Sequence, residues 1–204
     1  YDKHQFDSTG RYVLGMRPPF EGRTPGAEDA LEVGYVDVQD GDRWTTIGTS
    51  RAWNWQQGCM LQWIPGSDDI IYNDRRDGAF VSVIYSLETK SERVLPHPIY
   101  TVSPNGKFAA TLNFARLAYT RPGYGYTGVP YTKLDAMVPE DEGVFLLNLE
   151  TGARSLIQSL KEIAAVDHRD SMDGGLNWVN HLLFSTDGSR LVSGNRPEAQ
   201  GAQQ

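Results

Sequence analysis

The chain alternates short apolar segments with tight polar turns, and one such phrase occurs four times. Each copy is an apolar segment, a polar turn and a second apolar segment, and the copies start at Phe6, Trp63, Val102 and Phe184. Short segments of this kind, bounded by Gly, Pro, Asn, Asp and Ser, are typical of β-hairpins. A repeat of this length is typical of stacked or radially arranged units. The pattern therefore predicts an all-β protein built from repeated hairpins.

A second hairpin repeat alternates with the first. It consists of a strand, a polar turn and a return strand, and its copies begin at Tyr35, Ile84 and Leu147. Two hairpins in succession form a four-stranded antiparallel unit, which is the blade of a β-propeller. The alternation predicts blades at residues 3–48, 58–96, 99–158 and 179–196, of which the last contains two strands.

Three and a half blades do not close a ring, because closed propellers contain about four to eight blades. We therefore expect a partial β-propeller, either a fragment of a longer chain or a ring whose missing blades come from a partner. Residues 197–204 are predicted to form a disordered tail. Residues 155–166 have apolar positions near helical spacing, although their first half also fits a strand. The long insertion at 115–142 is rich in tyrosine and is expected to be ordered.

Composition narrows the classes of partner. The formal net charge of −7 argues against nucleic-acid binding, which normally needs a basic face. No apolar run reaches the roughly 18 residues of a membrane span. The single cysteine, Cys59, excludes an internal disulfide and a cysteine-based metal cluster, and it is expected to be a small buried hydrophobe. The sequence begins at Tyr1 without an initiator methionine, so the compartment stays open.

One face of the predicted propeller collects the unusual residues. In a four-stranded meander, the loops before the first strand and after the second strand emerge on the same face, because successive strands run in opposite directions. An arginine follows the second strand in every blade, and a ring of guanidinium groups is suited to binding carboxylates. Inter-blade salt bridges to Asp and Glu are the alternative. The candidate ligand-binding residues on this face are Arg17, Trp55, Gln57, Asn73, Arg75, Asn113, Arg116, Tyr124, Tyr126, Asn180 and Arg196.

Aromatic and histidine side chains add to this face. Trp53, Trp55 and Trp178 are candidate stacking platforms for sugar rings or aromatic ligands, with packing between blades as the alternative. The long insertion contributes Tyr124, Tyr126 and Tyr131, with packing of that loop on itself as the alternative. His181 and His168 are candidate metal ligands, with a packing role as the alternative. Two histidines alone do not complete a metal site, which needs three or four ligands. No cofactor is therefore assigned with certainty.

Particular segments resemble known propellers. Residues 178–190, Trp-Val-Asn-His-Leu-Leu-Phe-Ser-Thr-Asp-Gly-Ser-Arg, resemble the TolB-like and oligogalacturonate-lyase-like propellers. Residues 53–63 and 113–126 look like segments of bacterial members of that group. The resemblance implies that oligogalacturonate lyases are the enzymatic relatives: seven-bladed propellers that cleave uronic-acid oligosaccharides by β-elimination. They use a divalent metal, typically manganese, held by histidines and a glutamine, and His181 falls where one such histidine lies. The resemblance alone also favours a periplasmic or secreted location.

Two functional hypotheses follow. In the first, the chain is a binding module that takes an anionic saccharide or a protein partner at its loop-rich face. In the second, it belongs to a metal-dependent lyase that acts on uronic-acid oligosaccharides. There, Arg75, Arg116 and Arg196 would hold carboxylates, and manganese at His181 would stabilise the developing enolate. The remaining metal ligands would lie in later blades, so whether the chain is an enzyme stays open.

Overall fold

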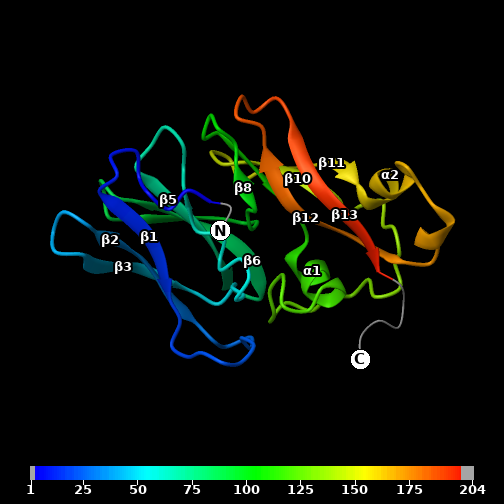
Figure 1. Ribbon diagram of the computed structural model, residues 1–204, viewed down its shortest axis with the longest axis horizontal. Coiled ribbons are helices and arrows are strands. Elements are labelled where there is room, and N and C mark those ends of the chain that lie inside the picture. The colour runs from blue at the N-terminus through cyan, green and yellow to red at the C-terminus, as the bar shows by residue number, and fades with distance from the viewer. Residues whose placement is uncertain (1–2, 199–204) are drawn as a thin grey trace.

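The structure, a computed structural model, describes residues 3–198 and is mostly β, with four antiparallel sheets (Figure 1). The first sheet contains β1 (Tyr12–Arg17), β2 (Leu31–Asp37) and β3 (Arg43–Ser50). The second contains β4 (Gln62–Trp63), β5 (Asp69–Arg76), β6 (Ala79–Ser86) and β7 (Glu92–Leu95). The third contains β8 (Thr101–Val102), β9 (Phe108–Thr111), β10 (Gly143–Asn148) and β11 (Arg154–Ser159). The fourth contains β12 (Leu176–Phe184) and β13 (Leu191–Glu198).

The four copies of the first repeat form the same turn. In each copy a backbone N–H bonds to the carbonyl five residues later, from Asp7 to Tyr12, Ile64 to Asp69, Ser103 to Phe108 and Ser185 to Arg190, over 2.8–3.0 Å. A second hydrogen bond closes each turn, in which the backbone N–H of the fourth residue donates to the carbonyl of the first residue. Three of the four copies place a glycine there, and its positive φ suits a turn that L-residues adopt only with strain. The repeated hairpin predicted from the sequence is confirmed.

The four sheets follow one another along the chain. Residues 58–96 and 99–158 each contain one four-stranded sheet in which neighbours in sequence are neighbours in space. In the first sheet, Phe6 bridges Val13 and adds an inner segment next to β1. The fourth sheet has two strands among the described residues. The strand β13 runs to Glu198, two residues into the predicted tail, and residues 199–204 lie outside the described part.

Each sheet packs on the next one along the chain. Successive side chains of a strand point to opposite faces, and β5 shows this clearly. Ile70 and Tyr72 pack into one core with the first sheet, whereas Ile71 packs into a second core with the third and fourth sheets. Both faces of the second sheet are therefore covered. Full burial of one such side chain stabilises the fold by about 1.5–3 kcal/mol.

Two short α-helices and one 3₁₀ turn interrupt the strands: α1 (Phe114–Thr120), α2 (Leu160–Ala165) and η1 (Asp170–Met172). The helix α1 starts the long insertion and was not predicted, although Asn113 caps it by accepting bonds from two backbone N–H groups. The segment 155–166 divides, because its first half is β11 and its second half is α2. A capping box of Ser159 and Glu162 marks the change. No helix in residues 3–198 is long and apolar enough to cross a membrane.

Candidate functional site

Three polar side chains meet beside the first strands of the second, third and fourth sheets. Gln57 precedes β4, Tyr100 precedes β8, and Asn180 lies in β12. The Tyr100 hydroxyl donates to Asn180 Oδ1 over 2.8 Å and accepts from Gln57 Nε2 over 2.5 Å. Gln57 Nε2 also lies 3.4 Å from Asn180 Oδ1. The fold thus joins residues that are far apart in the sequence, and two of the three were predicted site residues.

His181 extends this group to the surface. Its backbone N–H donates to Tyr100 Oη over 3.0 Å and to Asn180 Oδ1 over 2.9 Å, and its side chain is exposed. The residue has φ +53° beside a β-bulge in β12, a conformation that histidine adopts more readily than most residues. We call Gln57, Tyr100, Asn180 and His181 the inner-strand cluster.

An aromatic and cationic arm of the insertion lies beside the cluster. The Tyr124 ring contacts the His181 ring edge to face, with 6.5 Å between centroids. The Arg121 guanidinium lies 5.2 Å from the Tyr124 ring centroid and 5.9 Å from that of Trp178. Arg121 has no carboxylate partner among residues 3–198. This cation is held in place by rings rather than neutralised by an acid.

The cluster also has unused hydrogen-bonding capacity. Gln57 Oε1 is shielded from solvent and accepts no hydrogen bond within the described part of the chain. Lys3 brings a second cation, with Nζ 5.0 Å from the Tyr100 ring centroid. The Arg121 guanidinium, the exposed His181 imidazole and the Tyr124 ring can together contact a ligand that carries hydroxyl and carboxylate groups.

Arg116, by contrast, is a buried anchor of the insertion. It is 2% exposed, and its guanidinium donates to the carbonyls of Asn177 (2.6 and 2.8 Å), Ala136 (3.0 Å) and Met137 (3.1 Å). It also bonds Tyr131 and lies 3.8 Å from Glu142. These contacts tie the insertion to β12, so the geometry favours the structural interpretation of this arginine.

Arg75 has a similar role at another junction. Its Nη2 donates to the Ala27 carbonyl and to Glu28, each over 2.7 Å, and its Nη1 lies 3.3 Å from the Gly128 carbonyl. Arg75 therefore connects the loop after β1 with the long insertion, again through protein acceptors.

The other two predicted arginines differ from these. Arg17 is exposed, lies 3.8 Å from Glu32 and stacks 5.4 Å above the Trp44 ring. Arg196 belongs to β13, and its side chain lies outside the described part. The three arginines whose side chains are described, Arg17, Arg75 and Arg116, do not form one ring of ligand-binding groups.

Asn73 and Tyr126 are inaccessible. Asn73 is fully buried, bonds both backbone groups of Ile99 over 2.7 Å, and donates to Tyr126 Oη over 3.0 Å. Tyr126 is 1% exposed and stacks on Phe114 with 4.3 Å between centroids. Burial raises the pKa of Tyr126 well above its usual range. Asn113 is also structural, since it caps α1 and donates to Glu142 over 3.2 Å.

The remaining predicted residues lie in separate contacts. Trp55 is 44% exposed, donates to the Arg23 carbonyl over 2.6 Å, and packs edge-on against Trp53. His168 follows α2 and bonds Asp173 over 2.8 Å, and no contact with His181 is present in the described structure. Within residues 3–198, no three His, Cys, Asp or Glu side chains are arranged to hold a metal ion.

Sequence reasoning missed Tyr100, Arg121 and Lys3. Tyr100 lies directly before β8, and Gln57 lies a few residues before β4. Their shared position before the first strand of a sheet was the sequence signal that could have identified Tyr100. Arg121 starts the same Arg-Pro-Gly-Tyr segment that contains Tyr124. Its proximity to Trp178 depends on how the insertion folds back, which no local pattern encodes.

No protein-family model matches the chain, and a search of curated proteins finds no match.

Proposed function

We propose that this chain is part of a β-propeller that binds an anionic saccharide at the inner-strand cluster and the Arg121–Tyr124 arm. The propeller is supported by the repeated antiparallel sheets, by their packing in chain order, and by the covered faces of the second sheet. In such an arrangement the innermost strands line the centre. The observation that carries the proposal is the exposed His181 imidazole beside the Tyr124 ring and the Arg121 guanidinium, all partly accessible next to the buried Tyr100–Asn180 hydrogen bond.

The chemistry of the cluster suits a uronic-acid sugar. A guanidinium with no carboxylate partner in the described chain forms bidentate bonds to a planar carboxylate. The ring of Tyr124 offers an apolar surface to the C–H face of a sugar, while its edge stays polar.

Calorimetric titration with a galacturonic-acid oligosaccharide tests this proposal. We expect the wild-type chain to bind the free acid and to bind its methyl ester more weakly, because esterification removes the negative charge. Arg121→Gln should weaken binding by about 10- to 150-fold, since a hydrogen bond to a charged group contributes about 1.5–3 kcal/mol. Arg17→Gln is the matched control, because Arg17 is exposed and pairs with Glu32.

Two results would refute the saccharide site. One is equal affinity for the acid and the ester. The other is an Arg121→Gln variant that binds as tightly as the control. If the chain bound none of the saccharides but bound a protein in a defined binding assay, its function would be protein recognition.

The lyase hypothesis has one observation in its favour, the exposed imidazole of His181 next to Tyr124. A β-elimination would remove the C5 proton, break the C4–O bond and form a C4=C5 double bond. A metal at His181 requires further ligands from outside residues 3–198, because no group of three suitable side chains is present there. The titrated mixture, supplied with Mn²⁺, would gain the ultraviolet absorbance of an unsaturated uronate if the chain were catalytic.

A further inference from the structure

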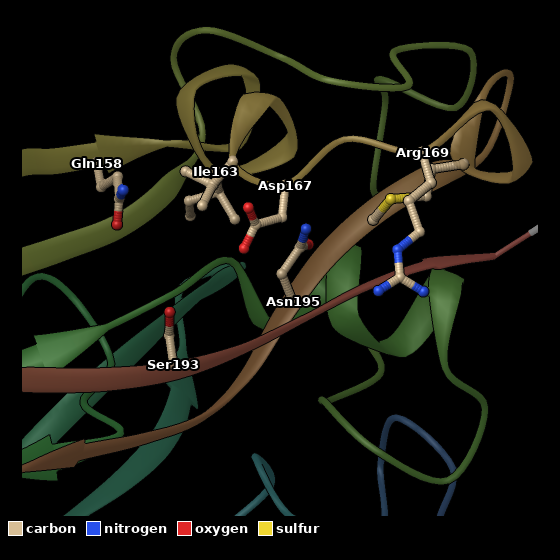
Figure 2. Close-up of a pocket in the computed structure, with 8 residues that line it drawn as sticks. Gln158, Ile163, Asp167, Arg169, Ser193 and Asn195 are labelled. Carbon is tan, nitrogen blue, oxygen red and sulfur yellow. The ribbon is translucent and has the colours of Figure 1, made fainter.

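Two cavities of the described chain differ in what lines them. The cavity in Figure 2 lies between α2 and β13, and its lining is aliphatic and polar, with one acid, Asp167, and one base, Arg169. The second cavity lies between the first and second sheets and has a volume of about 390 Å³. Three aromatic side chains line it, those of Tyr12, Tyr35 and Trp63. We call this space the inter-sheet cavity, and its volume is in the range of small-molecule sites.

The junction between the first and second sheets lacks a contact that the next two junctions have. At the second junction, an added Cβ at Gly106 would lie 2.3 Å from the Pro65 carbonyl oxygen. At the third, an added Cβ at Gly188 would lie 3.4 Å from Cδ of Pro104. In both cases the second residue of one repeated turn, a proline, meets the fourth residue of the next turn, a glycine. The equivalent residues at the first junction, where the inter-sheet cavity lies, are Ser8 and Ser67.

The Trp63 ring is held in place and is open to a cation. Its indole N–H donates to the Gln5 carbonyl over 3.0 Å, which uses its only donor, and the residue stays partly exposed. A tryptophan face attracts a cation more strongly than tyrosine or phenylalanine does. The Arg11 guanidinium lies 4.9 Å from the Tyr12 ring centroid, whereas no cation among residues 3–198 lies over the Trp63 ring.

Tyr35 adds a hydroxyl that the described chain does not use. Tyr35 is 8% exposed, lines the cavity, and packs edge to face on Tyr12 with 5.1 Å between ring centroids. Its hydroxyl has no hydrogen-bond partner among residues 3–198, although polar groups in such buried side chains normally have one. A ligand in the cavity would supply that partner.

Carboxylates line the same space without cations beside them. Asp68 comes from the repeated turn of the second sheet and Glu88 from the β6–β7 turn, and both are exposed. Neither has a basic partner among residues 3–198. Asp7, the third acid, accepts hydrogen bonds from Thr9 and from the Tyr12 backbone, which leave its negative charge in place.

The two basic residues of the lining do not balance these acids. Arg11 donates to both carboxylate oxygens of Asp37, over 2.9 and 2.6 Å, so its charge is already paired. Lys90 is the other base. The lining therefore has three acids and one base that is not paired within the described chain, and this excess of negative charge favours a cationic ligand.

We propose that the inter-sheet cavity binds a small organic cation, whose ammonium group lies on the Trp63 ring near the carboxylates of Asp68 and Glu88. The Tyr35 hydroxyl bonds a polar group of the same ligand. The cavity shares no residue with the inner-strand cluster or with the Arg121–Tyr124 arm, so this site is independent of the saccharide proposal.

Calorimetric titration of residues 1–204 with choline tests the proposal. The comparison ligand is the uncharged isostere in which a carbon replaces the ammonium nitrogen, because it keeps the shape and removes the charge. We expect choline to bind, and the isostere to bind about 2- to 30-fold more weakly, as the loss of a cation–π contact predicts.

Two variants separate the ring from the carboxylates. Trp63→Leu keeps an apolar side chain and should weaken choline binding by about 2- to 30-fold. The double variant Asp68→Asn with Glu88→Gln changes exposed side chains only and should weaken it by about 2- to 10-fold. The matched control is Asp77→Asn with Glu150→Gln, which removes the same charge from exposed sites outside the cavity and should bind choline like the wild type. Glu150 has the position of Glu88 in the turn of the next sheet.

Three results would each overturn the proposal. They are no choline binding by the wild type, equal affinity for choline and its isostere, and a carboxylate variant that binds choline as tightly as its control. If Trp63→Leu does not fold, as circular dichroism would show, the isostere and the carboxylate variant decide the question, because neither alters the interior.

Discussion

Replacing Arg116 by methionine tests whether this arginine holds the fold or a ligand. Methionine keeps most of the aliphatic volume and removes the guanidinium. The guanidinium donates to three backbone carbonyls, and it pairs with Glu142 where both side chains are at most 9% exposed. Its loss would leave those carbonyls without their donor and would remove the positive charge beside Glu142, which keeps its hydrogen bonds from Tyr131 and Asn113.

The expected cost follows from that burial. Removing one partner of a buried ion pair destabilises proteins by about 3–5 kcal/mol. With a urea dependence of about 2 kcal/mol per molar, the unfolding midpoint should fall by about 1.5–2.5 M. Circular dichroism in urea measures this shift, and the amides of residues 115–142 should exchange faster, because the anchor of the insertion is gone.

Arg17→Met provides the comparison. Arg17 is exposed, and its ion pair with Glu32 is 3.8 Å long, so this change should cost at most about 1 kcal/mol. If Arg116→Met shifted the midpoint no more than Arg17→Met does, the anchoring role would be refuted. Arg116 would then return to the candidate carboxylate-binding residues.

Three further predictions concern the packing of the interior and the stability of the chain at acidic pH. An added Cβ at Gly48 would lie 2.2 Å from the Tyr72 hydroxyl oxygen, so Gly48→Ala should cost about 1–3 kcal/mol in urea unfolding. The double variant with Tyr72→Phe should recover most of that loss, and a failure to recover would contradict the clash. A hydrogen bond from Arg23 lowers the pKa of Asp29 to about 2. Its stabilising contribution is therefore complete above the unfolded pKa of about 3.9 and is lost as pH falls through about 2. Asp29→Asn should flatten the decline of the urea midpoint over that range, and an unchanged slope would count against the pair. Burial raises the pKa of Cys59 to about 12, so a disulfide reagent should label it only as the chain unfolds; rapid labelling of the native protein would show that the thiol is accessible.

The hairpins were predictable because their determinants are local. Each first-repeat turn is closed by bonds within six residues, and Gly10, Gly106 and Gly188 supply the positive φ that the turn requires. The division of 155–166 into strand and helix is also local, since Ser159 and Glu162 form a capping box. The start of helix α1 is also encoded locally, because Asn113 caps its first turn. The glycine- and tyrosine-rich sequence after it is typical of a loop, and the helix was therefore not predicted.

The pattern of arginines along the chain did not predict where their side chains lie, because position in the sequence does not give the register of a residue within its sheet. Counted from the residue that closes each turn, Arg17 lies five residues after Tyr12, whereas Arg75 lies six after Asp69 and Arg116 eight after Phe108. Side chains alternate between faces along a strand, so the offsets of five and six place Arg17 and Arg75 on different faces of their sheets, while Arg116 lies in the helix α1 and not in a strand. The burial of Arg116 further depends on the packing of Ala136 and Met137 against it, which only the tertiary structure determines.

At His181, comparison with the equivalent position of the second sheet distinguishes the backbone conformation, which is shared, from the side-chain exposure, which is not. His181 lies four residues before Ser185, the first residue of its turn, and Met60 lies four before Ile64 in the second sheet. Both have a left-handed backbone, with φ +53° and +55°. A conformation that two of the four equivalent positions share is not by itself a sign of function. What distinguishes the fourth sheet is the side chain: Met60 is 2% exposed, while His181 is exposed beside Tyr124. The same backbone feature therefore fills a core in one sheet and presents an imidazole to solvent in another, and this difference makes His181 part of the candidate site.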